Sequence, residues 1–287
     1  MKKLKPYLFI APALIIFLIF SIYPIFNMIG LSFYEWDFIS PTKVFVGFKN
    51  YVNLFKDAEF FQTLTNTIVY MVLTVGIGLI LGIFLALFLN KNTKVNKFMQ
   101  SIIFSPYIVS LASVSFLWMW LMNTDFGLIN YILSIFNIPA IDWLGSPKIA
   151  LFSLVIISVW KTLGYNTIII LSALQSIPKY LYEAASLDRA NKKQVFFKIT
   201  LPMISPTLFF LTIVNIIASF KVFDTIQIIT QGGPQNSTNT LVYSLYEYGF
   251  KFYKIGYAST IGVVLLVIIA VFTVIYFKLL SKKVHYQ

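Results

Sequence analysis

Charged residues and cysteine are what this chain most lacks. Only 11% of its 287 residues are charged and 59% are hydrophobic, whereas a soluble globular domain is about 25% charged. Cysteine is absent, which excludes a disulfide framework and makes the redox compartment uninformative. This composition favours lipid as the main solvent of the chain.

Motifs of catalysis and of nucleotide binding are also missing. The chain has no Gly-x-x-x-x-Gly-Lys-Ser/Thr loop, no Gly-x-Ser-x-Gly and no His-Glu-x-x-His. Its one histidine, His285, lies near the C-terminal end without carboxylates beside it. We therefore expect no catalytic residue, no metal site and no cofactor bound by this chain. Such a protein either transports passively or takes its energy from a partner.

Long apolar runs are what the chain has instead. Six runs with few or no charges each exceed the about 20 residues that cross a bilayer as a helix. The first run is longer than the ~7–15 apolar residues of a signal peptide, so we expect it to be retained as a span. The sequence predicts one all-α polytopic membrane domain over residues 1–287, with six transmembrane helices at about 7–33, 62–90, 99–121, 149–174, 201–229 and 255–278.

Most of the 22 basic residues gather on one side of these spans. They precede the first span, separate the second from the third and the fourth from the fifth, and follow the sixth. Because cytoplasmic loops carry an excess of Lys and Arg, both termini and the loop 175–200 are predicted to be cytoplasmic. No basic face stands apart from the membrane, so the net charge of +12 is a signal of topology and no nucleic-acid partner is expected.

Small residues recur at four-residue spacing in the second span, at Gly78, Gly82 and Ala86. Such a stripe lets the backbones of two helices approach closely. Two interpretations stay open: the stripe packs against another helix of this chain, or it contacts a second membrane subunit.

The loop 175–200 is too long for a simple connection and carries helix signals. Pro178 suits the first turn of a helix, and Asn191 is expected to end that helix before a second one starts. A small, mostly apolar face lies between them, formed by Leu181, Ala184, Ala185 and Leu187. A helix resting on membrane lipid would need bulky residues on its buried face. Alanines suit a groove in a protein better, although the lipid alternative stays open.

This loop resembles the EAA motif of the membrane subunits of bacterial ATP-binding-cassette importers. That motif is Glu-Ala-Ala, three residues, Gly, nine residues and Ile-x-Leu-Pro; the chain has EAA at 183–185 and ITLP at 199–202. The resemblance implies a coupling helix that docks in a groove of an ATPase subunit. It assigns the coupling to Glu183, Ala184, Ala185, Asp188 and Arg189. Arg189 stands where the family has glycine, and it would be strained if that position has a positive φ.

Other blocks resemble carbohydrate-importer permeases of the maltose and glycerol-phosphate type, and the resemblance covers essentially the whole chain. They include FGLIN at 126–130, ALQSIP at 173–178, TQGGP at 230–234 and GYA at 256–258. The resemblance implies a transmembrane subunit of a binding-protein-dependent carbohydrate importer in the bacterial cell membrane. Such a subunit forms half of the translocation pathway.

The resemblance also implies the partners. They are a second permease subunit of the same fold, two cytoplasmic ATPase subunits that bind ATP and Mg, and an extracytoplasmic sugar-binding protein. Two other classes stay open. A passive channel or secondary carrier would work alone and would need no coupling loop, and an importer of amino acids or peptides would make the Gly-Gly-Pro block accidental.

Polar residues inside the fourth and fifth spans are the candidates for the substrate path. A charge in the hydrocarbon region costs at least ~2.5 kcal/mol and is functional by default. Lys161, Tyr165 and Trp160 in span four, with Asn215 and Ser219 in span five, combine hydrogen-bonding groups and aromatic faces suited to sugars. In maltose-type relatives the matching spans form a sugar site, so the resemblance supports the location alone. Three alternatives stay open: Lys161 pairs with a carboxylate of the partner subunit, Tyr165 packs in the core, and Asn215 bonds a neighbouring helix.

Overall fold

A computed structural model describes residues 5–280, which are mostly helical with one short pair of strands. They divide into two compact units, one made of residues up to 61 with 241–268, the other of 62–240 with the residues from 269 onward. The predicted all-α membrane architecture is confirmed. The prediction that 1–287 form one domain stays a prediction.

The first unit joins the N-terminal helices to the start of the last span. Its elements are α1 (Lys5–Phe17), the π-helical turn η1 (Leu18–Ile22), α2 (Tyr23–Leu31), the strands β1 (Tyr34–Glu35) and β2 (Val44–Phe45), α3 (Lys49–Lys56), α13 (Leu241–Tyr246), the π-helical turn η3 (Glu247–Lys251) and the first part of α14 (Ile255–Leu280). The strands pair antiparallel, with Tyr34 opposite Phe45.

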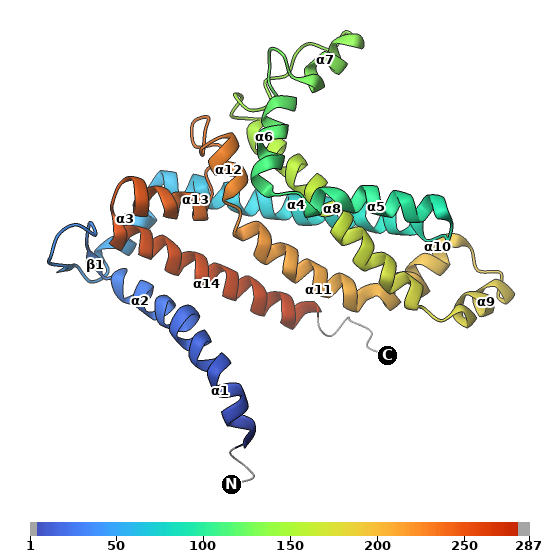
Figure 1. The fold of residues 1–287 in the computed structure, drawn as a ribbon, viewed down its shortest axis with the longest axis horizontal. Helices are drawn as coiled ribbons and strands as arrows, with labels where there is room; N and C mark the ends of the chain where they lie inside the picture. Colours follow the sequence, from blue (N-terminus) through green and yellow to red (C-terminus); the bar gives the residue numbers. More distant parts are fainter. Residues whose placement is uncertain (1–4, 281–287) are drawn as a thin grey trace. The chain divides into compact units, whose positions relative to one another are not determined.

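The second unit holds the remaining helices (Figure 1). They are α4 (Ala58–Leu89), α5 (Lys94–Ile108), α6 (Leu111–Leu121), α7 (Leu128–Ile135), α8 (Ala150–Ser176), α9 (Lys179–Leu187), α10 (Lys192–Val195), the π-helical turn η2 (Phe196–Thr200), α11 (Leu201–Phe220) and α12 (Asp224–Ile229). A core cluster of buried apolar side chains joins α4, α8 and α11.

Five helical segments of the described residues are long and apolar enough to cross a membrane, and a bent pair supplies a sixth. The five are 9–31, 58–89, 150–176, 192–229 and 255–278. The predicted third span, 99–121, corresponds to this bent pair, in which α5 and α6 meet at 99°. Pro106 lies in the last turn of α5, and the Ser110 hydroxyl caps α6 by accepting a hydrogen bond from the Ser113 amide at 3.2 Å.

The fifth predicted span, 201–229, is also interrupted. Helix α11 ends at Phe220, and Lys221 follows as its C-terminal cap residue. Asp224 then opens the short helix α12. A cation near a helix C-terminus and an anion near a helix N-terminus both interact favourably with the helix dipole. Lys221 therefore stabilises the end of α11, and Asp224 stabilises the start of α12.

Two π-helical turns precede prolines. Proline lacks the amide that would bond the carbonyl four residues earlier, so Pro24 and Pro202 leave the carbonyls of Phe20 and Lys198 without their helical donors. Phe20 lies inside η1 and Lys198 inside η2. The helix widens locally instead of breaking, and 192–220 remains one continuous helical rod.

The glycine stripe of α4 packs within this chain. A Cβ at Gly82 would lie 3.3 Å from both the Cβ of Asn166 and the Cδ1 of Ile170 on α8. Ala86 is fully buried in the core cluster that Ile170 also joins. Of the two interpretations of this stripe, the structure therefore supports internal packing.

Helix α5 crosses α8 at Gly164, and replacing this glycine with alanine should sharply lower the yield of folded protein. A Cβ at Gly164 would collide with the backbone of Ile103 and Phe104, which cannot move aside as a flexible side chain can. Gly76→Ala is the matched control, because its Cβ would meet open space. We expect size-exclusion chromatography of the extracted protein to show a sharp peak for the control alone. Equal peaks would contradict the close crossing.

The loop that carries the Gly-Gly-Pro block is held by α4. The Asn66 amide donates to the carbonyls of Asn236 and Asn239, at 2.8 and 3.1 Å, and the Gln62 amide donates to the Gln235 carbonyl at 3.0 Å. The block is thus a folded turn whose backbone carbonyls are fixed by a neighbouring helix.

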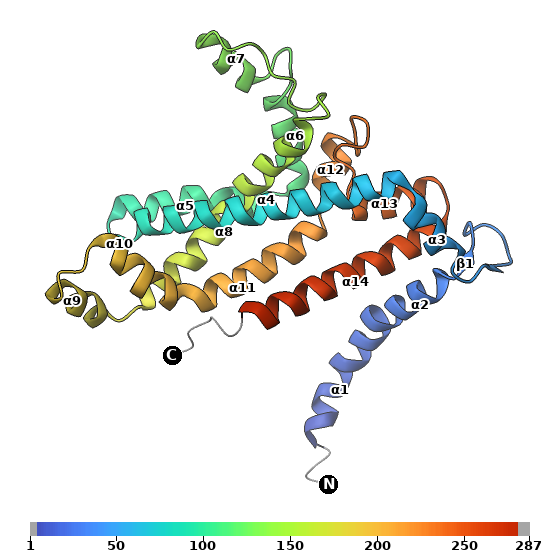
Figure 2. The same ribbon diagram turned by 180° about the vertical axis from the view of Figure 1, so that it is seen from behind.

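The connections of the second unit lie at opposite ends of α8. Figure 2 shows α9 and α10 beside one end of that helix and α6 with α7 towards the other. This is the arrangement expected if loop 175–200 and the loop after α6 face opposite sides of a membrane. The terminal lysines Lys2, Lys3, Lys282 and Lys283, on which the predicted sidedness partly depends, lie outside the described residues.

Candidate functional site

Helix α9 is anchored to the core by one face. Leu181 and Tyr182 pack against the core cluster of α4, α8 and α11, and the Tyr182 hydroxyl lies 3.3 Å from the Thr200 hydroxyl. Ala185, one turn after Leu181, is buried. These positions recur at the spacing that places residues on one side of a helix, so α9 is fixed to the rest of the unit.

The opposite face of α9 is left exposed by the residues that the structure describes. Leu187 is 87% exposed and Tyr180 is 65% exposed, and Glu183 and Ala184 between them are exposed too. The prediction of one apolar face made of Leu181, Ala184, Ala185 and Leu187 is therefore wrong, because Leu181 and Ala185 point inward while Ala184 and Leu187 point outward. Tyr180 and Leu187 therefore add apolar surface to the outer face of a helix whose inner face is anchored.

Helix α9 ends in a Schellman motif centred on Arg189. The amide of Ala190 donates to the Ala185 carbonyl at 2.9 Å, and the amide of Arg189 donates to the Ser186 carbonyl at 3.1 Å. This geometry requires a left-handed residue, and Arg189 has φ = 51°. The expectation that this position has a positive φ is confirmed, and arginine occupies it at a conformational cost.

Replacing Arg189 with glycine should stabilise the end of α9 by about 1 kcal/mol, because glycine adopts positive φ without the steric cost that a Cβ imposes. We expect transport by Arg189→Gly to equal that of the wild type and its thermal inactivation to begin at a higher temperature. Arg189→Ala is the control, since it removes the guanidinium and keeps the strain. Loss of transport in both variants would assign the guanidinium a contact with a partner.

Asn191 starts the next helix and does not end α9, so the sequence prediction for this residue is wrong. Its side chain accepts from the Gln194 amide at 2.9 Å, while the Gln194 side chain accepts from the Asn191 amide at 2.9 Å. This capping box opens the rod that runs through α10, η2 and α11 to Phe220. Asp188, exposed at the end of α9, and Asn191 therefore flank the short bend between the anchored helix and span five.

Lys161 caps the break in the third span. Its ammonium donates to the carbonyls of Pro106, Tyr107 and Val109 at 3.2, 3.3 and 2.7 Å. An ammonium has three donors, and these carbonyls lie where α5 loses its helical partners and carries the negative end of its dipole. Lys161 therefore stabilises a bend that the hydrocarbon would otherwise disfavour.

The two aromatic candidates on α8 face the same bent pair. Tyr165 stacks on Tyr107 of α5, with ring centroids 4.8 Å apart and planes 17° apart. Trp160 meets Trp118 of α6 edge to face at 5.4 Å. Both rings are partly exposed, so each presents one side to its neighbour and part of its surface outward.

The candidates on α11 lie in a different cluster. The Asn215 amide donates to the Asn166 side chain of α8 at 2.9 Å and to the Leu211 carbonyl at 2.8 Å. Ser219, one turn further on, is buried. Within residues 5–280, no hydrogen bond or ring contact joins Lys161 or Tyr165 to either of them, so the five candidates form two groups.

Sequence reasoning missed two parts of this region. Asn166 is a buried amide inside a span, and its polarity among apolar neighbours was the available signal. The carbonyls of Pro106, Tyr107 and Val109 at the bend gave no signal in the sequence, because every residue has a backbone carbonyl and a side-chain pattern does not report it. Only Pro106 and the cap residue Ser110 hinted at the break.

Comparisons with known proteins agree with the predicted family. Residues 78–286 match the family described as "Binding-protein-dependent transport system inner membrane component". The probable ABC transporter permease protein YurN of Bacillus subtilis is 36% identical over 271 residues, covering 93% of this chain and 92% of YurN. The sn-glycerol-3-phosphate transport system permease protein UgpA of Pectobacterium atrosepticum is 36% identical over 285 residues, covering 98% and 96%.

A solved structure shares the fold as well. A chain in the crystal structure of a bacterial alginate ABC transporter, in complex with an alginate-pentasaccharide-bound periplasmic protein, superposes with a TM-score of 0.84 at 26% identity, covering 98% of this chain and 96% of that one. In such transporters the permease is non-catalytic, and ATP hydrolysis resides in a separate subunit. The chain therefore belongs to the family of inner-membrane permease components of binding-protein-dependent ABC transport systems.

Proposed function

We propose that this chain is a transmembrane subunit of an ATP-driven carbohydrate importer and couples to its ATPase through α9. The observation that carries the proposal is the two-faced construction of α9. One face is fixed in the core, and the other exposes Glu183, Ala184 and the 87%-exposed Leu187. Such a helix transmits motion to the core, because a displacement of its outer face also moves the core residues to which its inner face is attached.

The carbohydrate class rests on the relatives. UgpA is named for sn-glycerol-3-phosphate transport, and the structural relative is named for alginate. Both compounds carry several hydroxyl groups and an anionic group. A carbohydrate substrate, neutral or anionic, is therefore the class that the relatives favour over amino acids or peptides.

In the proposed assembly this chain pairs with a second permease subunit of the same fold. Two ATPase subunits bind ATP and Mg on the cytoplasmic side, and a sugar-binding protein docks on the opposite side. Closure of the ATPases moves α9, and the continuous rod 192–220 carries that motion into span five. The pathway then opens alternately to the two sides of the bacterial cell membrane, with both termini of this chain in the cytoplasm.

The proposed substrate path follows α8 and α11. Tyr165 and Trp160 supply ring surface from α8, while Asn215 and Ser219 supply polar groups from α11. Lys161 contributes by holding the backbone at the bend, since its three donors are engaged there. A substrate anion could contact its ammonium only by displacing one of these carbonyls.

Co-expression with candidate permease, ATPase and binding-protein genes from the same genome tests the proposal. We expect the chain to co-purify with an ATPase and, in proteoliposomes, to import one sugar of a panel when its binding protein and ATP are present. Uptake without ATP would support a passive channel or secondary carrier instead. ATP-dependent uptake of amino acids or peptides, with no sugar imported, would retain the importer and overturn the carbohydrate class.

A further inference from the structure

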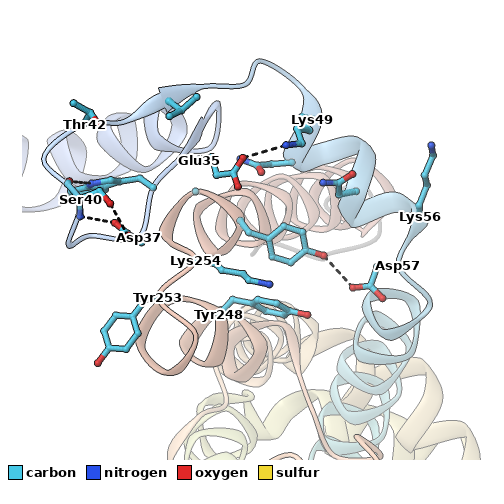
Figure 3. A pocket seen from close by; sticks show the side chains of 16 residues that line it. Glu35, Asp37, Ser40, Thr42, Lys49, Lys56, Asp57, Tyr248, Tyr253 and Lys254 are labelled. Carbon is cyan, nitrogen blue, oxygen red and sulfur yellow. Dashed lines mark hydrogen bonds and ion pairs between the residues drawn. The ribbon is translucent and has the colours of Figure 1, made fainter.

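A cavity of about 750 Å³ lies in the first unit, and none of its lining residues belongs to the proposed substrate path or to α9. It is enclosed by the segment around β1 and β2, by α3 and by the segment that leads into α14 (Figure 3). Its volume falls within the about 300–1,000 Å³ of small-molecule sites. The lysine distribution predicts that these segments are extracytoplasmic, so the cavity opens where an imported solute arrives.

The walls of this cavity are fixed by buried contacts. The Asn50 amide donates to the carbonyls of Ser32 and Tyr34 at 2.9 and 3.0 Å, and its side chain is almost fully buried. Gly256 lies against the Tyr34 backbone so closely that a Cβ would collide with the carbonyl. The site is therefore preformed.

The charges that line the cavity balance. The lining includes three carboxylates, from Glu35, Asp37 and Asp57, and three ammonium groups, from Lys49, Lys56 and Lys254. With no net charge, the cavity has no strong preference for an anion or a cation. A ligand that offers both donors and acceptors, as hydroxyl groups do, fits such a lining best.

The carboxylates are oriented and keep free lone pairs. Glu35 pairs with Lys49 at 3.3 Å. Asp57 accepts from the Tyr257 hydroxyl at 3.2 Å and from the Glu59 amide at 2.9 Å. A carboxylate has about four acceptor positions, so each can still accept from a ligand hydroxyl.

Three donors that line the cavity are unused within residues 5–280. The side chains of Asn53, Tyr248 and Lys254 make no hydrogen bond or ion pair there, and Lys254 only approaches the Tyr248 ring, at 6.0 Å. Burial raises the pKa of Tyr248 to about 12, and the nearby carboxylates of Glu59 and Asp57 add to the rise. The phenol therefore stays protonated at physiological pH and can donate to a ligand oxygen.

Tyr253 offers an open aromatic surface at the edge of the cavity. It is 52% exposed and has φ = 53°, a conformation that costs free energy for a residue with a Cβ and is concentrated at functional sites. Trp36, by contrast, already has the Lys43 ammonium 4.3 Å from its ring centroid and Phe38 at 4.9 Å. Tyr253 is therefore the ring best placed to stack on a ligand.

We propose that this cavity binds a neutral saccharide directly, as a second extracytoplasmic carbohydrate site on the permease itself. Hydroxyl groups would bridge the free donors Asn53, Tyr248 and Lys254 and the oriented carboxylates, while an apolar sugar face lies on Tyr253. The saccharide class rests on the proposed function. The cavity holds solute next to the membrane after the binding protein releases it.

The assembled transporter in nanodiscs, without binding protein or nucleotide, provides the test. Saturation-transfer NMR with glucose, maltose, sucrose, trehalose and the sugar identified by the import panel reports binding. The variants are Tyr253→Ala and Lys254→Ala. Their matched controls are Tyr131→Ala and Lys148→Ala, which change exposed residues of the same predicted side that do not line the cavity.

We expect at least one of these saccharides to bind, and each cavity variant to weaken its binding by about tenfold or more, while both controls bind as the wild type does. Absence of binding, or equal affinity in all variants, would overturn the site. A separate ATPase assay with binding protein and ATP completes the test. Cavity variants that bind sugar normally but lose stimulation by the binding protein would also overturn the site, since the cavity would then receive a side chain of that protein. If any of these results occurs while the transporter still imports sugar, the cavity site is overturned and the proposed function stands. Failure of the site can therefore be distinguished from failure of the proposed function.

Discussion

Lys161→Met should reduce transport by more than tenfold in assembled complexes that retain basal ATPase activity. The substitution leaves the carbonyls of Pro106, Tyr107 and Val109 without the donor that caps them. A backbone carbonyl in the hydrocarbon region costs several kcal/mol when it has no donor, and each 1.36 kcal/mol is a factor of about ten in a rate or an equilibrium. We expect the bend between α5 and α6 to lose its fixed geometry and the pathway beside it to lose its shape.

Lys161→Arg is the control, because a guanidinium has five donors and can cap the same carbonyls. A capping role predicts that arginine restores most of the transport, and that methionine slows every imported sugar by the same factor. A change of selectivity with an unchanged maximal rate would instead show that the ammonium contacts the substrate. Normal rate and selectivity in Lys161→Met would contradict both roles.

Asn215→Ala tests the substrate-path candidates on α11 separately from those on α8. Asn215 bonds Asn166 across α8 and α11, and such bonds average about 0.6 kcal/mol within membranes. A purely structural Asn215 therefore predicts a small loss of thermal stability and nearly normal import. A large loss of import at normal stability would place the amide in the substrate path, which transport and thermal-stability assays on the same preparation can decide.

The spans predicted from hydropathy agree with the structure where a helix is straight. Residues 255–278 were predicted for the last span, and α14 covers 255–280. Hydropathy also placed α4 and α8 to within a few residues. It did not show the bend in the third span, because an apolar run reports only that a segment lies in lipid. The direction of the backbone at Pro106 and Ser110 depends on hydrogen bonds, which an average over side chains does not contain.

The candidate site, like the spans, could be predicted from the sequence only in part. The EAA and ITLP blocks marked the loop that we propose as the coupling element, but the two faces of α9 depend on which residues meet the core of α4, α8 and α11. Likewise, the charge of Lys161 marked it as a residue with a role. Its partners are carbonyls more than fifty positions earlier in the chain, and only the crossing of α5 over α8 at Gly164 brings them within reach.

Charge reversal on the outer face of α9 should uncouple transport from ATP hydrolysis. Glu183→Lys inverts an exposed charge on the helix that we propose docks on the ATPase, and Leu187→Asp places a charge where the structure exposes an apolar side chain at 87%. If the interface excludes water, either change costs several kcal/mol, because it buries an unpaired charge or a like-charge contact. We expect binding-protein-stimulated ATPase activity and sugar import to fall to background in both variants.

The folded state of α9 should survive these changes, because its attachment depends on Leu181, Tyr182 and Ala185, which point into the core. Lys94→Glu is the matched control, a charge reversal at the exposed first residue of α5, on the same predicted side. Membrane levels should equal the wild type in all three variants, and only the α9 variants should lose import. Full import by Glu183→Lys and Leu187→Asp at normal levels would exclude α9 as the coupling element. Loss of the ATPase subunit on purification, with the permease itself intact, would identify docking as the step that fails.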